Sequence, residues 1–365
     1  MPVKLDFTPE RWEKLAKDWK AFWDGDLPRP MVVLEVYPRD DVESFVGWTQ
    51  FIPHYPPATS DEEILDLCQH HLERMHWLGD AWPRWWPNFG PGIQAGFLGA
   101  RVESSEATVW FKPPTPVIVD DLSLAYSPDN PWLQRAIGLL TQAFARWEDC
   151  VCLGQPDLGG NLDVLASFVT TQQLLYDVQD KPEKVLDLSR QLTGLWLRYY
   201  DIFDEIIAQT GRGTTDWGPC WYPGRGYMLQ SDFSYMISPV MFRRFVLPDL
   251  EACCAQMDYG FYHLDGAGEV RHMDALLSLP RLRGVQWQPG AGTPRHPHWL
   301  PILKKIRDAG KLCQVYVTPE EALAIGRELG VKGFIFAIDP PSLTPEQGQA
   351  FLSQMAQENG LQGLQ

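Results

Sequence analysis

The last third of the chain contains four apolar runs, GFYHLD (260–265), GVQWQ (284–288), LCQVYV (312–317) and GFIFAI (333–338). An amphipathic segment with the apolar spacing of a helix follows each run, at 268–278, 298–309, 319–329 and 345–358. Strands that alternate with helices of this length are βα units, and right-handed crossovers assemble such units into a parallel sheet. The sequence therefore predicts a parallel sheet covered by helices.

The earlier part of the chain supplies further strands of the same kind. A buried strand is predicted at 31–37 and shorter strands near 107–111, 116–119, 150–154 and 213–217, and no glycine-rich phosphate loop follows the first of them. About eight strands in all favour a closed barrel over an open, doubly wound sheet, and a chain of 365 residues suits one barrel with insertions. We predict a single (β/α)8 TIM-barrel domain over residues 1–365, with an N-terminal helical extension at 1–30 and long loops over its C-terminal face.

Capping residues predict where the first helices begin. Thr8 followed by Pro9 begins a helix with an apolar stripe. Ser60 is followed three residues later by a glutamate, which makes a capping box for a helix that runs to about Trp77. Residues 80–105 are rich in Trp, Pro and Gly, and we expect them to form a loop.

The composition excludes several classes of protein. A formal net charge of −16 at pH 7 argues against nucleic acid as a partner, because phosphates would be repelled. The chain has no run of about 18 apolar residues and its first residues lack the apolar core of a signal peptide, so we expect a cytoplasmic protein that does not enter a membrane. Seven cysteines, an odd number without a CxxC motif, indicate reduced thiols rather than a disulfide framework.

Polar side chains recur where the predicted strands end, which is where a barrel of this kind carries its active site. His263 and Asp265 are two residues apart on one strand, so their side chains share a face. They are the predicted catalytic pair, with His263 as a general acid or base tuned by the carboxylate, or both as metal ligands together with Asp339. A hydrogen-bonded core histidine is the structural alternative. The substrate-binding residues predicted from strand ends and the adjoining loops are Asp157, Trp217, Tyr222, Gln286 and Gln314.

The second half of the chain resembles the uroporphyrinogen decarboxylase superfamily. The resemblance rests on five motifs in the order of that superfamily, GQPDLGGNLDVL (154–165), DVQDKPEKV (177–185), LQSDFSYMISPVMFRRFVLP (229–248), FYHLDGAG (261–268) and GFIFAI (333–338). In the first half, WPNFGPG (86–92) and ATVWFKP (107–113) resemble an uncharacterised subgroup of it. The superfamily fold is a (β/α)8 barrel, in agreement with the strand count.

The resemblance implies one of two chemistries. One is cofactor-free decarboxylation of porphyrinogen acetates, and the other is methyl transfer from a corrinoid or methylated donor to a zinc-bound thiolate. The zinc-dependent members carry His-x-Cys-Gly where this chain has HLDG (263–266), and Asp339 stands near the position of their second zinc cysteine. Hard ligands thus replace soft ones, which argues against thiolate activation by zinc. The set His263, Asp265 and Asp339 could hold Zn, another divalent ion or no ion.

The resemblance also bears on substrate binding. Asp232 lies in a well-marked stretch of the superfamily, and Asn161 and Trp110 lie in the other matching motifs, so all three are predicted pocket residues. Decarboxylases carry an arginine-rich N-terminal motif that grips the carboxylates of the substrate. In LPRPMVVLEVYPRD (27–40) this chain has only Arg29 and Arg39.

The leading hypothesis is a methyltransferase-like enzyme that acts on a small molecule, with a corrinoid protein as the implied partner and a homodimer as the implied assembly. A cofactor-free decarboxylase, which is a lyase, is the alternative. Many tryptophans and strand-end carboxylates also suit a carbohydrate-active barrel, which needs two carboxyl groups at a defined separation. A non-catalytic ligand-binding protein is the remaining alternative, because the fold does not decide the function.

Overall fold

The computed structural model describes residues 3–37, 50–56, 58–105, 107–113, 115, 117–339 and 343–364, and these form a mixed α/β structure. The strands are β1 (Met31–Val36), β2 (His76–Gly79), β3 (Arg84–Trp85), β4 (Arg101–Ser104), β5 (Val109–Lys112), β6 (Cys152–Leu153), β7 (Gly226–Leu229), β8 (Tyr259–Asp265), β9 (Leu282–Gln288), β10 (Leu312–Val317) and β11 (Phe334–Ile338). The α-helices are α1 (Pro9–Trp23), α2 (Asp61–Leu72), α3 (Gln94–Phe97), α4 (Pro131–Trp147), α5 (Asn161–Val169), α6 (Thr171–Asp180), α7 (Pro182–Ile207), α8 (Pro239–Phe245), α9 (Leu247–Ala255), α10 (Met273–Leu277), α11 (Leu300–Asp308), α12 (Pro319–Leu329) and α13 (Pro345–Asn359).

A seven-stranded sheet in the order β2-β1-β11-β10-β9-β8-β7 forms the centre of the molecule. The pairs from β1 to β7 are parallel, and β2 joins β1 in the antiparallel direction. His263 is in register with Gln286, and Gln286 with Gln314, so three polar residues form one row across β8, β9 and β10. The short strands β3 and β6 form a separate parallel pair, and β4 and β5 form an antiparallel hairpin.

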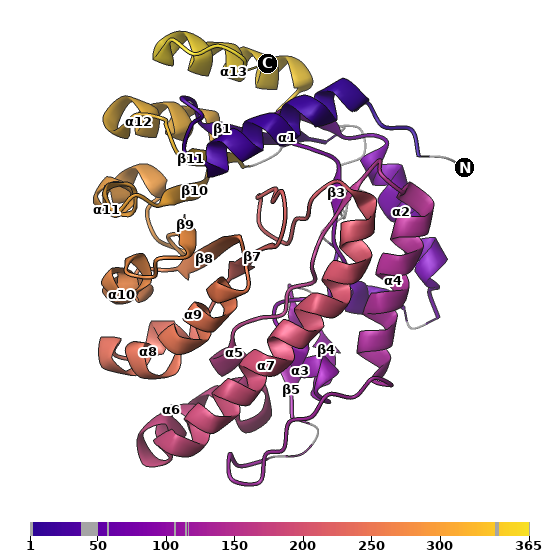
Figure 1. The fold of residues 1–365 in the computed structure, drawn as a ribbon, viewed down its shortest axis with the longest axis vertical. Coiled ribbons are helices and arrows are strands. Elements are labelled where there is room, and N and C mark those ends of the chain that lie inside the picture. Colours follow the sequence, from indigo (N-terminus) through magenta and orange to yellow (C-terminus); the bar gives the residue numbers. More distant parts are fainter. Residues whose placement is uncertain are drawn as a thin grey trace.

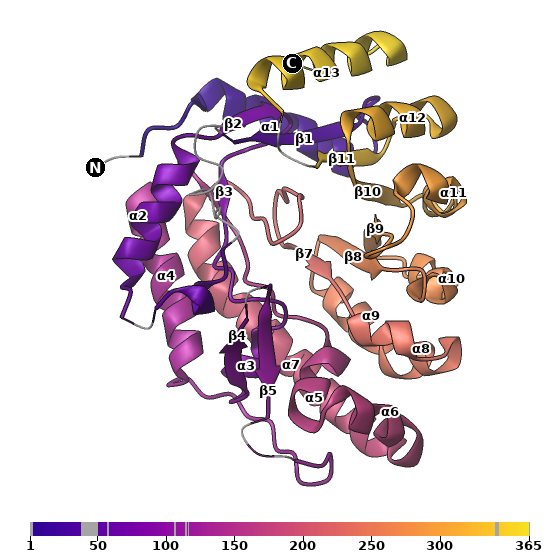
Figure 2. The same ribbon diagram turned by 180° about the vertical axis from the view of Figure 1, so that it is seen from behind.

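Helices cover the sheet in the pattern that βα units produce. Helices α8 to α13 lie in a row along one side of the sheet, each beside the strand that precedes or follows it (Figure 1). Helices α2, α4 and α7 form the opposite side of the molecule, and Figure 2 shows the same arrangement from behind. The parallel sheet with helical connections predicted for residues 260–358 is therefore confirmed.

The first helix closes one end of the sheet. The side-chain oxygen of Thr8 accepts from the Arg11 N–H and Pro9 occupies the first turn, as predicted. Trp19 and Trp23 on its inner face are buried, and the Trp23 indole N–H donates to the Trp221 carbonyl at 2.9 Å. The helix is thus anchored to the loop before β7 by both packing and a hydrogen bond.

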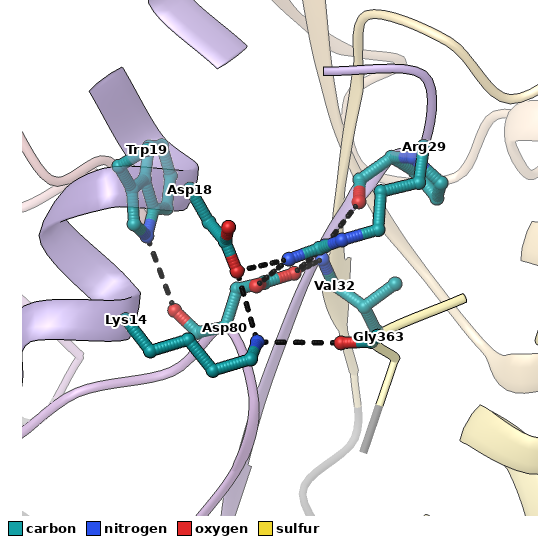
Figure 3. Close-up of polar contacts among 8 residues, drawn as sticks. Lys14, Asp18, Trp19, Arg29, Val32, Asp80 and Gly363 are labelled. Atoms are coloured by element: carbon teal, nitrogen blue, oxygen red, sulfur yellow. Dashed lines mark hydrogen bonds and ion pairs between the residues drawn. The ribbon is translucent and has the colours of Figure 1, made fainter. Parts of the chain in front are cut away.

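A buried ion pair fixes the start of β1 (Figure 3). Arg29 lies directly before the strand and pairs with Asp80 at 2.7 Å, and Asp18 of α1 contacts the same guanidinium at 2.9 Å. Asp80 also accepts from the Val32 N–H at 2.8 Å. Arg29 is therefore a structural residue at the N-terminal end of β1. Arg39, the other arginine of residues 27–40, lies outside the described residues.

Two predictions for the region after Ser60 were wrong in part. The capping box at Ser60 is present, but α2 ends at Leu72, and the residues around Trp77 form β2 instead of a last helical turn. Residues 80–105 were predicted to be a loop and contain β3, α3 and β4. These elements have two to four residues each, which is too short for an apolar period to be visible in the sequence.

Two further findings concern the chain as a whole. Among the described helices, none combines the length and the apolar character that crossing a bilayer requires. All seven cysteines are free thiols, and six of them are buried, in agreement with the predicted reduced state.

Candidate functional site

His263 lies near the C-terminal end of β8 and is held by two neighbours. Its Nδ1 donates to Gln286 Oε1 in a short hydrogen bond, so Gln286 on β9 fixes both the tautomer and the ring orientation. The indole of Trp217 packs edge to face against the imidazole, with ring centroids 5.1 Å apart. Because Nδ1 faces Gln286, Nε2 is the nitrogen left for a ligand or a proton.

Two carboxylates gather beside this imidazole. Asp265 ends β8 on the same face as His263, and Asp232 comes from the 3-10 segment Asp232–Met236. One potential ligand atom from each of Asp232, His263 and Asp265 lies within 4.8 Å of the others. The first two predicted site residues, His263 and Asp265, are therefore joined by Asp232, which the sequence had suggested as a pocket residue.

The segment that carries Asp232 is tied to helix α5. Asp163 accepts from the backbone N–H groups of Asp232 and Phe233, at 3.1 and 2.7 Å. On the other side, His272 donates from Nε2 to the Ser234 carbonyl at 2.8 Å. The position of the Asp232 carboxylate thus depends on polar contacts from two elements distant in sequence.

Burial, with a smaller contribution from neighbouring carboxylates, raises the pKa values of three aspartates in this region. The pKa of Asp232 is raised because the surrounding protein removes water from its carboxylate and because Asp265 is close, although His263 opposes the shift. Burial and the charge of Asp232 raise the pKa of Asp163 well above its usual value. Burial also raises the pKa of Asp157 to about 7. The carboxyl groups of Asp157, Asp163 and Asp232 are therefore harder to ionise here than in water.

A cavity of about 510 Å³ opens where the strands end, and we call it the mouth cavity. Its described lining consists of Val33, Glu35, Tyr37, Phe51, Arg84, Trp86, Asn88, Trp217, Pro219, Tyr316, Ala337, Ile338 and Asp339. Trp217 is shared between this cavity and His263, so the histidine lies behind one of its walls.

Arg84 is a residue of the mouth cavity that sequence reasoning missed. Its Nε pairs with Glu35 at 2.9 Å, and its guanidinium lies 5.3 Å from the rings of both Trp82 and Trp86. Burial raises the pKa of Glu35, against the attraction of Arg84. The signal was present in the sequence, because an arginine placed among tryptophans in WPRWWP (82–87) is typical of a cation–π contact.

A second cavity of about 400 Å³ lies on the Asp232 side. Its polar lining includes Asp163, Gln230 and Asp232, and the β4–β5 hairpin contributes Trp110. Trp110 is 56 % exposed, so it forms the rim of this cavity rather than a buried wall. The carboxylate Asp232 is thus reachable from a cleft of its own.

The remaining predicted residues are more dispersed. Gln314 is fully buried in the row with Gln286. Tyr222 is fully buried and donates to Asp216 at 3.1 Å, and it lines neither of the two cavities. Asp157 accepts from Gln230 at 3.0 Å, and Asn161 donates to the Ser189 carbonyl at 3.0 Å. The Asp157 side chain therefore joins two loops, and the Asn161 side chain joins helices α5 and α7.

Asp339 does not join Asp232, His263 and Asp265. It follows β11, which is separated from β8 by β9 and β10 in the sheet, a span of about 14 Å at the usual strand spacing. Its carboxylate is half exposed and lies 3.9 Å from Arg295. Asp339 lines the mouth cavity, and Asp232 takes the place that the sequence had suggested for it beside His263 and Asp265.

His272 should make the protein sensitive to mild acid. The residue is buried and stacks on Phe242, and burial lowers its pKa. Below its unperturbed pKa of about 6.5 the unfolded chain binds this proton more readily than the folded one, so acidification destabilises the folded state. We expect His272→Phe to lose about 1 kcal/mol at pH 7, the value of one hydrogen bond, and to lose less than the wild type between pH 7 and pH 5.

Urea unfolding at both pH values measures these differences. The exposed His298 provides the matched control, because His298→Phe should leave the wild-type pH dependence unchanged. If the His272 variant and the wild type lose the same unfolding free energy between pH 7 and pH 5, His272 is not the source of the acid sensitivity.

Compared with models of known protein families and with curated proteins, the chain matches none of them.

Proposed function

We propose that this chain is an enzyme that transforms a small molecule at a divalent metal ion held by Asp232, His263 and Asp265. The chemistry proposed is methyltransferase-like and belongs to the uroporphyrinogen decarboxylase superfamily, which the sequence motifs resemble. The observation that carries the proposal is the approach of three potential ligand atoms to within 4.8 Å of one another, with Asp232 in the lining of a cavity of about 400 Å³.

The three residues are close enough to hold a divalent ion after a modest closure. Bonds of about 2.0–2.2 Å in tetrahedral geometry put the ligand atoms about 3.3–3.6 Å apart, so side chains within 4.8 Å of one another would have to approach by up to about 1 Å. One imidazole and two carboxylates suit Zn and also harder ions such as Mn or Mg. The ion would also offset the burial and the charge of Asp265, which raise the pKa of Asp232.

Two neighbouring residues would hold the ligands of such an ion in position. Gln286 holds the Nδ1–H of His263, which presents Nε2 for ligation in the manner of an outer-shell partner. Asp163 holds the backbone of Asp232. When bound, the ion would supply Lewis acidity to a substrate oxygen, and its hard ligands favour an oxygen acceptor over the thiolate of the zinc-dependent relatives.

The fold proposed for this function is a single (β/α)8 barrel. The parallel pair β3–β6 and a parallel bridge from the residue after β6 to Thr215 support it, because they supply strands between β1 and β7. Two side-chain contacts span the remaining gaps. Arg84 of β3 pairs with Glu35 of β1, and Asp216 accepts from the Met228 N–H of β7 at 2.6 Å.

Cofactor-free decarboxylation is the second candidate function. The raised pKa of Asp232 beside His263 favours it, because a carboxyl that keeps its proton can deliver it to a carbanion after carbon dioxide leaves. This chemistry needs no ion, so metal content separates the two candidates.

Metal analysis of the purified protein tests the proposal. We expect about one divalent ion per chain in the wild type and a loss of at least about 100-fold in ion affinity for His263→Ala. His298→Ala, which removes an exposed imidazole, is the matched control and should bind the ion like the wild type. A metal-free wild type that also fails to bind Zn, Mn or Mg in titration would remove the metal proposal and leave decarboxylation.

A further inference from the structure

Four partly exposed aromatic side chains line the mouth cavity, and each comes from a different segment of the chain. They are Tyr37 directly after β1, Phe51 directly before the 3-10 helix Ile52–His54, Trp217 in the loop before β7 and Tyr316 on β10. Most of the described tryptophans are, by contrast, buried in the core. Partly exposed aromatic surface that converges on one cavity from four segments is typical of a ligand site.

The floor of the cavity is apolar. Val33 of β1, Ala337 of β11 and Tyr316 of β10 are in register across three neighbouring strands, and all three line the cavity. Ala337 is the central member and has only a methyl side chain, which leaves room for a ligand between the other two. The volume of about 510 Å³ is in the range of sites for small molecules.

The most exposed charge of the described lining is negative. Arg84 is the cation of that lining, but its side chain is only 6 % exposed and pairs with Glu35 at 2.9 Å. The carboxylate of Asp339 is 48 % exposed. Arg295 lies 3.9 Å from Asp339 and forms closer hydrogen bonds to Glu321, at 2.9 and 3.0 Å. Asp339 therefore keeps most of its charge for a ligand in the cavity.

This charge disfavours an anionic ligand and a metal ion does not suit the lining. A phosphate or carboxylate would be repelled by Asp339 and by the net charge of −16 of the whole chain. A metal ion needs several ligand atoms close together, and among the described residues the group that provides them is Asp232, His263 and Asp265. None of those three residues belongs to the lining of the mouth cavity.

Aromatic faces and a carboxylate together attract an organic cation. The face of an aromatic ring carries partial negative charge and attracts an alkylated ammonium group that lies over it. Such a group has at most one N–H, so an aromatic wall can surround it without leaving donors unpaired. We infer that the mouth cavity binds a small molecule through a quaternary or tertiary ammonium group. The inference goes beyond the proposed function, because it uses none of the three proposed metal ligands.

Calorimetric titration of the full chain with choline tests the inference. Choline carries a quaternary ammonium group, and its carbon isostere, in which a carbon atom replaces the nitrogen, is a neutral counterpart of the same shape. We expect choline to bind with a dissociation constant below about 10 mM and the isostere to bind at least about tenfold more weakly.

Two variants of the lining locate the bound cation. Phe51→Leu removes an aromatic face but keeps an apolar side chain, so it should weaken choline binding about fivefold. Asp339→Asn removes the exposed carboxylate with little change of shape, so it should weaken choline binding about threefold and leave binding of the isostere unchanged. Both positions are partly exposed, so the unfolding midpoints should stay close to that of the wild type. Trp110→Ala is the matched control, because it removes an exposed ring outside the mouth cavity and should not change choline binding.

Three outcomes overturn the inference. They are no binding of choline up to about 100 mM, equal binding of choline and its isostere, and wild-type choline binding in both lining variants. Ion content is measured on the same samples. Protein that holds its divalent ion and does not bind choline overturns this inference alone, whereas choline binding by protein that takes up no ion overturns only the metal proposal.

Discussion

We expect the variant Asp80→Asn to lose about 3–5 kcal/mol of unfolding free energy. The Asp80 carboxylate accepts from both terminal nitrogens of Arg29, at 2.7 and 2.8 Å, and from the Val32 N–H at 2.8 Å. Both side chains of the pair are 4 % exposed. Asparagine keeps the shape and one acceptor but removes the charge, so the guanidinium of Arg29 stays buried with Asp18 as its remaining carboxylate partner.

Urea unfolding followed by tryptophan fluorescence measures this loss. Lys14→Met is the matched control, because it removes an ion pair with the same Asp18 through a lysine that is 51 % exposed. Exposed pairs contribute little, so the control should change the unfolding free energy by less than about 1 kcal/mol. Equal losses in the two variants would show that the buried Arg29–Asp80 pair stabilises the fold no more than the exposed Lys14–Asp18 pair does.

Truncation of Trp23 should destabilise the protein by about 3–5 kcal/mol. The indole is 2 % exposed and packs against the rings of Tyr222, Tyr259 and Phe261, with centroids 5.1–5.8 Å away. Trp23→Ala leaves a cavity between α1 and β8 and removes the hydrogen bond to the Trp221 carbonyl. The loss should appear as a lower midpoint in urea unfolding.

Trp110→Ala is the matched control for Trp23→Ala. Its indole is 56 % exposed on the β4–β5 hairpin, so truncation removes little buried surface. The expected change is within about 0.5 kcal/mol. A Trp23 variant as stable as the Trp110 variant would mean that the N-terminal helix contributes little to the stability of the sheet.

The regular part of the fold could be predicted because each element there is decided by its own residues. The predicted strand 312–317 and helix 319–329 agree with β10 and α12 at both ends. Thr318 caps that helix and Pro319 occupies its first turn, so local sequence defines the boundary. Strands β8 and β9 begin one or two residues before the predicted positions.

Elements that depend on distant partners could not be predicted. The apolar pattern of residues 163–177 predicts one helix there, but α5 ends at Val169 and α6 begins at Thr171. Thr170 between them has a φ of 76°, in the left-handed region that favours glycine. The sequence has neither a glycine nor a proline there that would predict the break. Similarly, β2 exists because its residues pair with β1, with Trp77 opposite Glu35, which the local pattern of the chain does not reveal.

The same distinction separates the two halves of the candidate site. His263 and Asp265 could be placed together from the alternation of one strand. The sequence alone could not decide whether Asp339 or Asp232 lies beside them. That choice depends on the strand order and on a 3-10 segment held by Asp163. Long-range hydrogen bonds of this kind have no signature in the local sequence.

The pairing of β1 with β11 has a consequence for how the protein is made. Residues 31–33 are in register with residues 335–337, so the edge of β1 that β11 covers remains unpaired while the intervening chain is synthesised. An unpaired, apolar strand edge is a template for wrong pairing with other chains. We therefore expect the nascent protein to need a chaperone, or slow translation at low temperature, for high yields of properly folded material. A circular permutant that joins the two ends and opens the chain between α7 and β7 would synthesise the two strands close together in time and should relieve that need.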